Sequence, residues 1–442
     1  MSLLDMIKDA GVIGAGGAGF PTHVKLSSKS EYILLNGAEC EPLLRVDQQL
    51  MEFYSKEILI GFEEARKLVD AKEGIIGVKG KHKKVIQILR EKIKELEFEE
   101  FISVKEIPDI YPAGDEQVLV YELTKRIVPE GGIPIQVGCV VLNSETALNI
   151  YNASLGQPVI YKYITVAGDI PNPITVKVPV GTPIMEVLKL SGIEDFNDFK
   201  VIDGGPMMGP VMKDLKGSIT KKNKGFIILK NSHPLIRKKT VTMERSKRIN
   251  KTSCEQCRMC TDMCPRFLLG HNTQPHKMMR AISYNLDNLE ELKNSYLCCQ
   301  CNLCELFSCP AGLYPKAANM YFKQKLMEGN IRFNKVQNDY TVRNAREFRL
   351  VPSARLIARL GLKVFDKKAP MKEVTINSDI VKILTSQHVG APCIPCVKID
   401  DYVEEGQVIG SIPEKSLGAT IHASIPGVIT EITDEFISIR RE

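Results

Sequence analysis

Residues 254–265 read Cys-Glu-Gln-Cys-Arg-Met-Cys-Thr-Asp-Met-Cys-Pro, in which four cysteines are spaced C-x2-C-x2-C-x3-C and followed by proline. A second run holds Cys298, Cys301 and Cys304 in the same spacing, and Cys309-Pro310 follows after a gap of four residues. Nine of the 13 cysteines lie in these two runs, which is the strongest pattern in the sequence. Three thiolates at this spacing can cover one face of an iron–sulfur cubane.

The two runs predict two [4Fe–4S] clusters, because in two-cluster proteins the fourth cysteine of each run ligates the other cluster. Cluster one would take Cys254, Cys257, Cys260 and Cys309, and cluster two would take Cys298, Cys301, Cys304 and Cys264. The alternative is two zinc sites of four cysteines each, but zinc sites typically show two separated C-x2-C pairs. Cys299 is surplus, and we expect a packed thiol beside the cluster, although it could compete with Cys298.

The composition indicates a globular protein in a reducing compartment. Its 442 residues favour about three domains, and its 44% hydrophobic and 25% charged residues are ordinary for folded chains. The net charge of +6 does not favour a nucleic-acid partner. There is no apolar run of about 18 residues that could span a membrane, and the N-terminus lacks the basic start of a signal peptide. We therefore expect a cytoplasmic protein with free thiols.

The hydrophobic pattern changes along the chain, which predicts a multidomain α/β and β protein. Residues 1–155 alternate apolar strands, such as 32–35, 74–78 and 136–142, with helical patterns at 51–69 and 83–96. Residues 160–230 are short β-rich runs broken by Pro and Gly, with one helix at 183–191. A basic linker at 231–251 leads into the cysteine region, a helical stretch covers 331–375, and the tail from 380 has a β pattern.

The N-terminal segment Gly14–Gly19 contains G-x-G-x-x-G but does not fit an ordinary dinucleotide fingerprint. Pro21 interrupts the helix that should follow, and the segment begins close to the N-terminus. A glycine-rich loop can nevertheless offer backbone N–H groups to a phosphate. The alternative is a tight loop without a ligand.

Three further segments place polar side chains at the ends of predicted strands or helices. These are Asn36–Pro42, Tyr111–Gln117 and Asn143–Thr146. Ligands of open α/β sheets bind at the carboxyl ends of the strands. A flavin ring needs such hydrogen-bonding groups around its edges.

With the loop Gly16–Thr22 (GGAGFPT), these segments resemble the flavin and NADH site of the NADH-binding subunit of respiratory complex I. Ala15 and Leu26 depart from that pattern, because the complex I subunits have Arg and an aromatic residue there. The resemblance implies that Lys25 faces a phosphate or the flavin N1 region and that Glu116 borders the nicotinamide as the catalytic residue. It implies a cofactor-binding set of Gly16, Gly17, Gly19, Lys25, Asn36, Glu39, Glu41, Tyr111, Gly114, Glu116, Asn143 and Thr146.

The whole chain resembles the family of Rnf complex C subunits and cobalamin reductases of propanediol utilisation. Shared segments include Gly204–Gly209 (GGPMMG), Cys264–Arg280 and Gln387–Pro392. The resemblance implies an FMN/NADH-binding α/β domain at 1–155, a soluble-ligand-binding β-grasp module at 156–232, a helical two-cluster ferredoxin-like domain at 233–330, a helical linker at 331–378 and a lipoyl-like barrel-sandwich β domain at 379–442.

The function implied by this resemblance is electron transfer from NADH through FMN and two [4Fe–4S] clusters, with cobalamin as the favoured acceptor. The alternative is a relay that serves a partner reductase, as in Rnf or D-proline reductase systems, without oxidising NADH itself. Cobalamin or a cobalamin-dependent or reductase protein is then the partner. Docking to a membrane or microcompartment assembly, or a location within a bacterial microcompartment, is compatible with either function.

Two features of the tail have alternative explanations. Lys415 lies near the modified position of lipoyl-type domains, but its neighbours Glu414 and Ser416 do not match the usual carrier tips, so we expect a docking module. Cys393 and Cys396 form a C-x2-C motif. This motif is either a redox dithiol, half a metal site or two buried cysteines.

Overall fold

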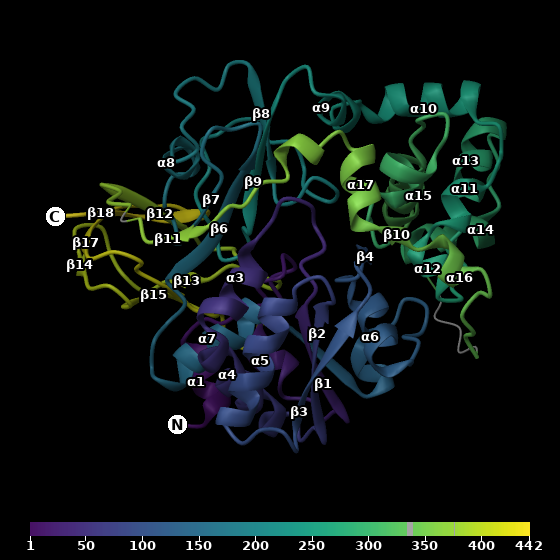
Figure 1. Cartoon of the computed structure of the whole chain (residues 1–442). Helices are drawn as coiled ribbons and strands as arrows, with labels where there is room; N and C mark the ends of the chain where they lie inside the picture. The colour runs from purple at the N-terminus through teal and green to yellow at the C-terminus, as the bar shows by residue number, and fades with distance from the viewer. Residues whose placement is uncertain (334–338, 375) are drawn as a thin grey trace.

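The computed structural model describes residues 1–442 except 334–338 and 375 (Figure 1). The N-terminal part is an α/β domain around a parallel sheet of order β3-β2-β1-β5. Its strands are β1 (Tyr32–Gly37), β2 (Glu73–Lys79), β3 (Ile102–Ile107) and β5 (Cys139–Asn143). The expected strands at 32–35 and 74–78 are confirmed, whereas the third begins only at Cys139 because a short 3-10 turn, η1 (Pro134–Val137), precedes it.

Helices cover both faces of this sheet, because alternate strand residues point to opposite sides. Ile33 and Leu35 of β1 join the apolar core beneath the first helical layer, whereas Leu34 packs toward α6 (Glu116–Thr124). The first layer comprises α1 (Leu3–Asp9), α3 (Val46–Phe53), α4 (Ser55–Leu68), α5 (Lys83–Glu95) and α7 (Ser144–Ser154). The helix expected at 51–69 is divided at Tyr54, which ends α3 and precedes α4.

The middle of the chain forms a five-stranded mixed sheet of order β11-β7-β6-β9-β8. Its strands are β6 (Tyr161–Gly168), β7 (Ile174–Pro179), β8 (Phe199–Asp203), β9 (Gly225–Lys230) and the late strand β11 (Met371–Lys372). The expected helix in this region is α8 (Ile184–Lys189), whose Ile184, Val187 and Leu188 pack on the sheet. One helix on a mixed sheet is the arrangement expected of a β-grasp module.

The cysteine region is helical and lies to one side of the α/β domain (Figure 1). Its elements are α9 (Pro234–Lys239), α10 (Met243–Ser253), α11 (Met259–Asp262), α12 (Pro265–Leu268), α13 (Pro275–Tyr284), α14 (Leu289–Lys293), η2 (Asn294–Leu297), η3 (Cys304–Ser308) and α15 (Pro315–Glu328). The expectation of a linker at 231–251 is wrong. Leu235 and Ile236 of α9 are buried, and α10 contacts α13 and α15.

The segment after α15 joins the other parts together. Its β10 (Val351–Pro352) pairs with β4 (Ile110–Tyr111) of the α/β domain, and β11 pairs with β7 of the middle sheet. The helices are short, α16 (Arg346–Arg349), α17 (Ser353–Arg359) and the 3-10 turn η4 (Lys363–Phe365), so the expected helical stretch is only partly helical in the described residues. A short helix, α2 (Thr22–Lys25), follows the glycine-rich loop.

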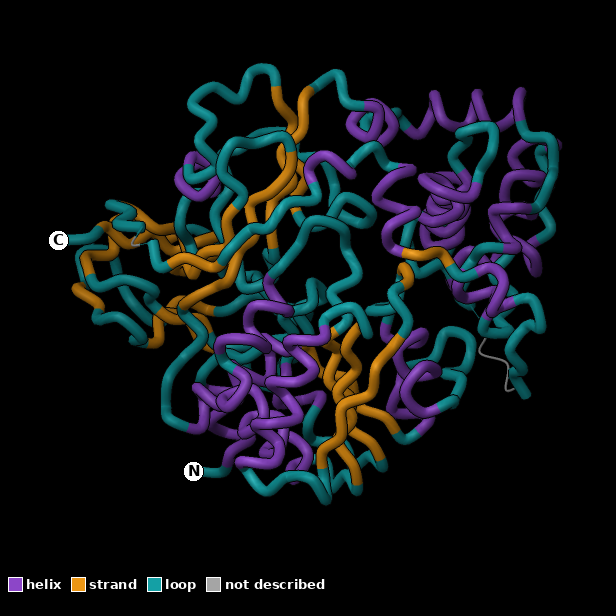
Figure 2. The backbone as a smooth tube through the Cα atoms, viewed as in Figure 1, coloured by secondary structure: helices purple, strands orange, loops and turns teal. Residues whose placement is uncertain are grey.

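The tail is a barrel-sandwich of two small antiparallel sheets, shown as orange strands beside the C-terminus in Figure 2. One sheet has the order β12-β18-β17-β14 and the other β13-β15-β16. The strands are β12 (Ile380–Leu384), β13 (Ile394–Pro395), β14 (Tyr402–Val403), β15 (Val408–Ser411), β16 (Ile421–His422), β17 (Gly427–Ile432) and β18 (Phe436–Arg440). Among the described helices, every one is too short or too polar to cross a bilayer.

Candidate functional site

A cavity of about 390 Å³ lies where the α/β domain meets the middle sheet and the cysteine region. Its wall includes nine residues of the expected cofactor set: Gly16, Lys25, Asn36, Glu39, Glu41, Gly114, Glu116, Asn143 and Thr146. Gly17 and Gly19 belong to the same loop as Gly16 but are outside the lining, and Tyr111 stands behind the wall. The carboxyl ends of β1 and β5 both open onto this cavity, as expected for a ligand site of a parallel sheet.

The glycine-rich loop forms one side of the cavity. It is closed by hydrogen bonds from the Gly14 N–H to the Phe20 oxygen (2.9 Å) and from the Gly19 N–H to the Gly14 oxygen (3.2 Å). The Ala15 N–H donates to Thr146 Oγ1 at 2.9 Å. Within the described residues, the N–H groups of Gly16 and Gly17 have no hydrogen-bond partner. Free backbone donors on a loop of this kind fit a phosphate group.

Asn36 at the end of β1 holds the opposite wall. Its Nδ2 donates to the Gly114 oxygen at 2.9 Å, which fixes the segment before α6 against the strand. A Cβ at Gly114 would lie 3.1 Å from Cys40 Sγ, so a larger residue there would press on this thiol. Asp115 caps α6 by accepting hydrogen bonds from the N–H groups of Gln117 and Val118 at 3.1 Å. These contacts place Glu116 at the cavity.

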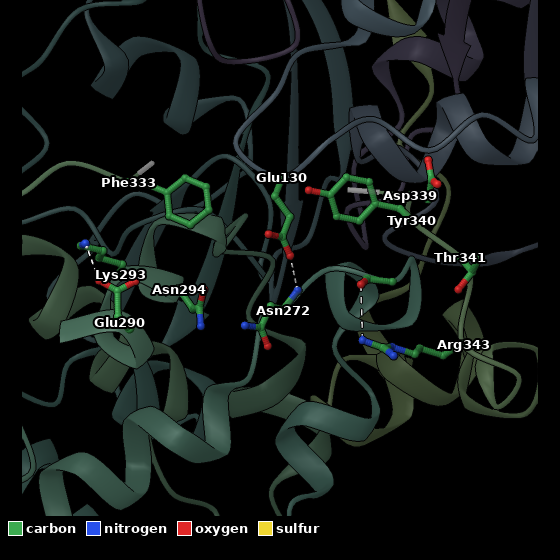
Figure 3. Close-up of a pocket in the computed structure, with 11 residues that line it drawn as sticks. Glu130, Asn272, Glu290, Lys293, Asn294, Phe333, Asp339, Tyr340, Thr341 and Arg343 are labelled. Atoms are coloured by element: carbon green, nitrogen blue, oxygen red, sulfur yellow. Dashed lines mark hydrogen bonds and ion pairs between the residues drawn. The ribbon is translucent and has the colours of Figure 1, made fainter. Parts of the chain in front are cut away.

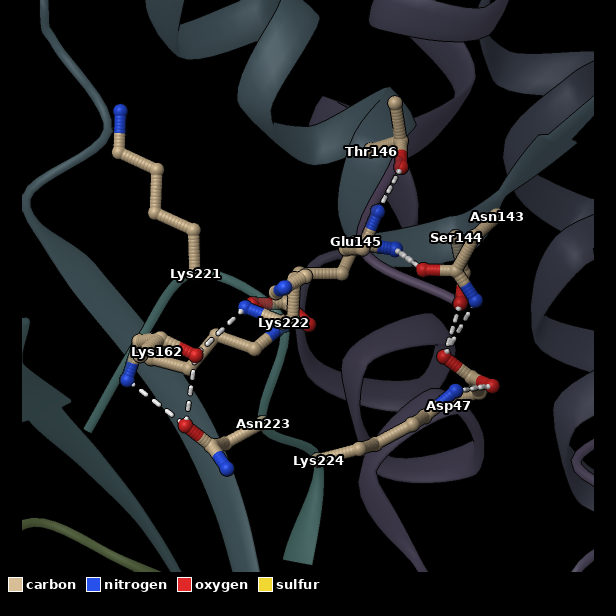
Figure 4. Close-up of polar contacts among 12 residues, drawn as sticks. Asp47, Asn143, Ser144, Glu145, Thr146, Lys162, Lys221, Lys222, Asn223 and Lys224 are labelled. Carbon is tan, nitrogen blue, oxygen red and sulfur yellow. Dashed lines mark hydrogen bonds and ion pairs between the residues drawn. The ribbon is translucent and has the colours of Figure 1, made fainter. Parts of the chain in front are cut away.

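A buried charge network forms the floor of the cavity (Figure 4). Glu39 accepts hydrogen bonds from the N–H groups at the start of α3, those of Asp47 (2.9 Å) and Gln48 (3.2 Å). Asp47 accepts from Asn143 Nδ2 at 3.0 Å and pairs with Lys224. Burial raises the pKa of Glu39, and the charge on Asp47 adds to this increase. Glu39 and Asn143 are therefore already hydrogen-bonded within the protein. A ligand in the cavity would meet side chains that are fixed in place.

Glu41 has a role that the sequence did not indicate. Its carboxylate accepts hydrogen bonds from the N–H groups of Met207 (2.8 Å) and Met208 (3.0 Å), in the loop Gly204–Gly209 of the middle sheet. Burial raises the pKa of this carboxyl group. Gly205 has no room for a side chain, since a Cβ would lie 2.1 Å from Glu41 Oε2. The GGPMMG segment is therefore the partner of Glu41, a contact between distant parts of the chain.

Lys25 and Glu116 are the charged pair at the mouth of the cavity. Lys25 Nζ lies 3.0 Å from Glu116 Oε1, and the two side chains are 32% and 41% exposed. Both can therefore turn toward a ligand without leaving a buried charge unpaired. This contact places Lys25, which we expect near the phosphate or the flavin, beside Glu116, which we expect near the nicotinamide.

Two lysines lie at the end of β2 and just after it, Lys79 and Lys81, and from the sequence they could meet a pyrophosphate, although a solvated loop is the favoured prediction. Lys79 is buried, and its Nζ lies 3.2 Å from Asp109 Oδ1 and 3.0 Å from Ser353 Oγ. Lys81 also pairs with Asp109, at 3.0 Å. Burial lowers the pKa of Lys79. The prediction was wrong for Lys79 because the sequence did not show that the segment before α17 would cover it.

The structure brings together the cysteines predicted for cluster one. Burial, together with the nearby thiols of Cys309, Cys254 and Cys257, raises the pKa of Cys260 to about 12. Cys260 and Cys309 are buried, Cys254 is half-buried and Cys257 is exposed. Burial therefore keeps the Cys260 thiol protonated in the absence of iron. It must lose its proton when a cluster binds, because only a thiolate ligates the metal.

The cysteines predicted for cluster two also converge. Burial raises the pKa of Cys264, and the thiols of Cys299 and Cys298 contribute. Burial likewise raises the pKa of Cys304, beside Cys298 and Cys264. Cys299 lies against Cys301 and both line the cavity, so the surplus thiol occupies the wall between the cavity and this cluster.

The zinc alternative is not supported by the arrangement of the thiols. A single zinc ion requires four ligands about 2.3 Å from the metal. In the part of the chain that the structure describes, no group of three or more His, Cys, Asp or Glu side chains could hold one metal ion. The spacing of the two cysteine runs therefore remains the reason to favour iron–sulfur clusters over zinc.

A larger cavity of about 790 Å³ lies between the cysteine region and the loop that contains Glu130 (Figure 3). Its wall is polar and contains none of the expected site residues. Glu130 accepts a hydrogen bond from the Asn272 N–H, and Lys293 pairs with Glu290 at 2.8 Å. Glu130, Glu290, Lys293 and Arg343 therefore already have partners within the protein.

The two tail cysteines are both free and differ in exposure. Cys393 is buried and Cys396 is exposed, with β13 between them. Burial raises the pKa of Cys393 to about 11. The interpretation as two packed cysteines holds for Cys393 only.

Comparison with known proteins assigns families to three regions of the chain. Residues 7–152 match the Nuo51 FMN-binding domain, residues 253–314 a 4Fe-4S dicluster domain, and residues 359–441 the RnfC barrel sandwich hybrid domain. The chain thus carries FMN-binding and two-cluster iron–sulfur domains, and it is a flavo-iron–sulfur electron-transfer oxidoreductase.

Similar proteins extend this result to the full length. The chain is 39% identical over 442 residues to cobalamin reductase PduS of Citrobacter freundii, covering all of this chain and 96% of that protein. The PduS protein of Salmonella typhimurium is 39% identical over 439 residues, covering 99% and 96%. The C subunit of the Na(+)-translocating ferredoxin:NAD(+) oxidoreductase complex of Acetobacterium woodii is 34% identical over 274 residues, covering 59% and 57%. The chain therefore belongs to the family of PduS cobalamin reductases, which is related to the Rnf C subunits.

Proposed function

We propose that this protein oxidises NADH at FMN and passes the electrons through two [4Fe–4S] clusters to cobalamin. The observation that carries the proposal is the 390 Å³ cavity, which has the glycine-rich loop and strand ends on one side and Cys301 on another. The name of the Citrobacter relative supports cobalamin as acceptor. When bound, FMN accepts two electrons together and releases them singly.

Within this proposal the chain's residues have distinct roles. The free N–H groups of Gly16 and Gly17 hold the phosphate, assisted by Lys25. Asn36 and Thr146 hold the two walls, and Glu116 borders the nicotinamide. Among the other members of the expected set, Glu39, Glu41, Gly114 and Asn143 form the rest of the wall, and Gly19 and Tyr111 support it from behind.

A relay without NADH oxidation is the second candidate, and one observation favours it. Ala15 and Leu26, where the complex I subunits have Arg and an aromatic residue, are buried and apolar. Neither supplies a hydrogen-bonding or stacking group to a dinucleotide. In this candidate a partner protein reduces the flavin, and the clusters deliver electrons to a partner reductase.

Four proposals about the assembly accompany this function. The domain boundaries are 1–155, 156–232, 233–330, 331–378 and 379–442. The partner is cobalamin or a cobalamin-dependent or reductase protein. The barrel-sandwich domain is a docking module, and the protein works in the cytoplasm, within a microcompartment or docked to a membrane assembly.

The test is anaerobic addition of NADH to the reconstituted protein, followed in the visible spectrum with and without cobalamin. Bleaching that recovers with cobalamin supports donor and acceptor together. Bleaching without recovery retains NADH oxidation and excludes free cobalamin as acceptor. No bleaching, with flavin and iron bound, contradicts NADH oxidation and supports the relay.

A matched pair of variants sharpens the result. Glu116→Gln should slow NADH-dependent bleaching while flavin content is retained, because the carboxylate borders the proposed nicotinamide position. Glu100→Gln removes an exposed carboxylate far from the cavity and should not change the rate. Equal rates in both variants would remove Glu116 from the reaction.

A further inference from the structure

We propose that the fold imposes one electron path, from the flavin cavity to cluster two, then to cluster one, and out at Cys257 to an acidic one-electron redox protein that docks on α10 and, under the proposed function, holds the cobalamin. The inference rests on the FMN-binding and two-cluster domains and does not require NADH to be the donor. It concerns the order of the clusters and the surface at which electrons leave.

The first step follows from which thiols touch the cavity. Cys301, a ligand of cluster two, lines the cavity together with its neighbour Cys299. None of the four cysteines assigned to cluster one lines the described cavity. An electron that leaves a flavin held there therefore meets cluster two first.

Three contacts hold the cluster-two loop against the cavity. Tyr111 donates its hydroxyl proton to the Cys301 oxygen at 2.9 Å. Asn302 Nδ2 donates to the Met207 oxygen at 2.8 Å, in the loop that Glu41 anchors. Arg266, two residues after Cys264, pairs with Asp115 at the cavity wall at 2.8 Å. The loop is thus fixed from both the α/β domain and the middle sheet.

Cluster one follows cluster two directly. Helix α11, which contains Cys260 of cluster one, packs against η3, which contains Cys304 of cluster two. Helix η3 (Cys304–Ser308) links Cys304 to Cys309, so one short element carries a ligand of each cluster. The two clusters therefore share a boundary inside the helical region.

Only cluster one reaches the surface through a fully exposed ligand among the described residues. Cys257 is exposed, whereas Cys264, Cys301 and Cys304 of cluster two are buried and Cys298 is half-buried. Helix α10 ends at Cys254 and lies at the outer edge of the helical region, away from β1–β5 (Figure 1). The exposed ligand therefore follows a helix that lies away from the sheet whose strand ends open onto the flavin cavity.

The surface at this exit is basic. Helix α10 carries four basic side chains, Arg245, Lys247, Arg248 and Lys251, and one acidic one, Glu244. Around the motif itself, Glu255 is exposed and Arg258 is neutralised by Asp262 at 3.1 Å. Helix α10 therefore carries a net positive charge beside the exposed Glu255. Such a patch steers a negatively charged partner.

Exposed apolar residues complete the exit face beside α10. Tyr284 and Leu286 are 66% and 41% exposed, and they flank Asn285, whose Oδ1 lies 3.5 Å from Lys251 Nζ. Asp287 follows and is exposed. A small apolar centre with charged residues around it suits a transient redox partner with an acidic rim.

The test uses two outer-sphere acceptors of opposite charge, ferricyanide and hexaammineruthenium(III). The bound flavin is reduced by light with EDTA as electron donor, so that NADH is not needed. Two ferricyanide ions take one electron each for every flavin reoxidised, and two protons pass to solvent. Arg248→Glu/Lys251→Glu should slow ferricyanide reduction about tenfold at low salt, speed reduction of the ruthenium complex and weaken the salt dependence.

The control variant is Lys56→Glu/Lys72→Glu, which makes the same charge change at exposed positions of the α/β domain. It should leave both rates within about twofold of the unchanged protein, because its charges lie beyond a Debye length of about 8 Å from the exit. If both double variants change the ferricyanide rate equally, or if neither changes it, the proposed exit face is wrong.

The order of the clusters has a spectroscopic test. After light reduction of the flavin, electron paramagnetic resonance should show both clusters reduced in the unchanged protein. In Cys301→Ser, which removes cluster two, cluster one should stay oxidised while the flavin is reduced. Reduction of cluster one at the normal rate in that variant would overturn the order. If Cys301→Ser loses all its iron, Cys257→Ser decides instead: cluster two should still be reduced, and its failure to be reduced would overturn the order.

Discussion

The hydroxyl group of Tyr111 donates a hydrogen bond to the backbone oxygen of Cys301 at 2.9 Å, although the two residues are 190 positions apart in the sequence. The same hydroxyl lies 3.2 Å from Glu41 Oε1. One phenolic proton can serve only one acceptor at a time. Tyr111 thus joins the α/β domain to the loop of cluster two, and Glu41 joins both to the middle sheet.

Tyr111→Phe should therefore lower the free energy of unfolding by about 1–3 kcal/mol, because it leaves a buried backbone oxygen without a donor. Urea-induced unfolding of the reconstituted protein measures the change. Tyr284→Phe removes a hydroxyl from an exposed tyrosine and should have no measurable effect. A loss as small as that of the control would show that the Cys301 oxygen finds another donor.

Iron analysis can separate the adjacent thiols Cys298 and Cys299. Cys298→Ser should lose about half of the iron, because it removes a ligand of one of two equal clusters. Cys299→Ser should retain all of the iron, since Cys299 lies on the cavity wall beside Cys301. The opposite result would make Cys299 the ligand. Cys301→Ser should also lose about half, and unchanged iron would contradict the assignment of cluster two.

The ion pair between Lys162 and Glu145 is the most buried in the described structure, with both side chains 1% exposed. Lys162→Met should lower the free energy of unfolding by about 3–5 kcal/mol, because the carboxylate would remain buried without a partner. Adding Glu145→Gln should restore part of this loss, since the double variant buries no net charge. An additive loss would show that the charges are not coupled.

The matched control for this pair is Lys29→Met. Lys29 pairs with Asp70 at 3.0 Å, but the side chains are 84% and 71% exposed. Surface pairs of this kind contribute about 0–1 kcal/mol. The difference between Lys162→Met and Lys29→Met in the free energy of unfolding measures the effect of burial on an ion pair of similar length.

Lys221 should make stability depend on pH. Its Nζ donates to the Gly11 oxygen at 2.8 Å and the Thr420 oxygen at 3.0 Å, and burial lowers its pKa to about 7. Above pH 7 the folded protein releases this proton while the unfolded chain keeps it up to its usual pKa near 10.5. The unfolded state then binds more protons, so the free energy of unfolding rises with pH, by about 2 kcal/mol between pH 7 and pH 9.

The measurement is the difference in unfolding free energy between the unchanged protein and Lys221→Met across this range. The difference cancels titration of the neighbouring Cys393, His388 and His422, which both proteins retain. Lys222→Met, at the adjacent position, should show no such trend. A difference that stays constant from pH 7 to pH 9 would show that Lys221 keeps its proton.

Much of the candidate site could be predicted from local patterns. The strand-end segments and the glycine-rich loop indicated a cavity, and nine of the expected residues line one. The contacts of Lys79 and Glu41 could not be predicted in this way, because their partners, Ser353 and Met207, lie far away in sequence. Burial and pairing of a charged side chain depend on what folds over it, and no local pattern reports that.

The cysteine spacing alone indicated the two clusters and predicted their ligands, because a cubane face requires thiolates at fixed short intervals. The alternation of apolar residues likewise determined the parallel sheet and the β tail. Only the tertiary structure decided which cluster faces the flavin cavity and which reaches the surface. That choice depends on contacts such as the one between Tyr111 and Cys301. The two loops are distant in sequence, and they meet because the apolar residues around them pack in one core.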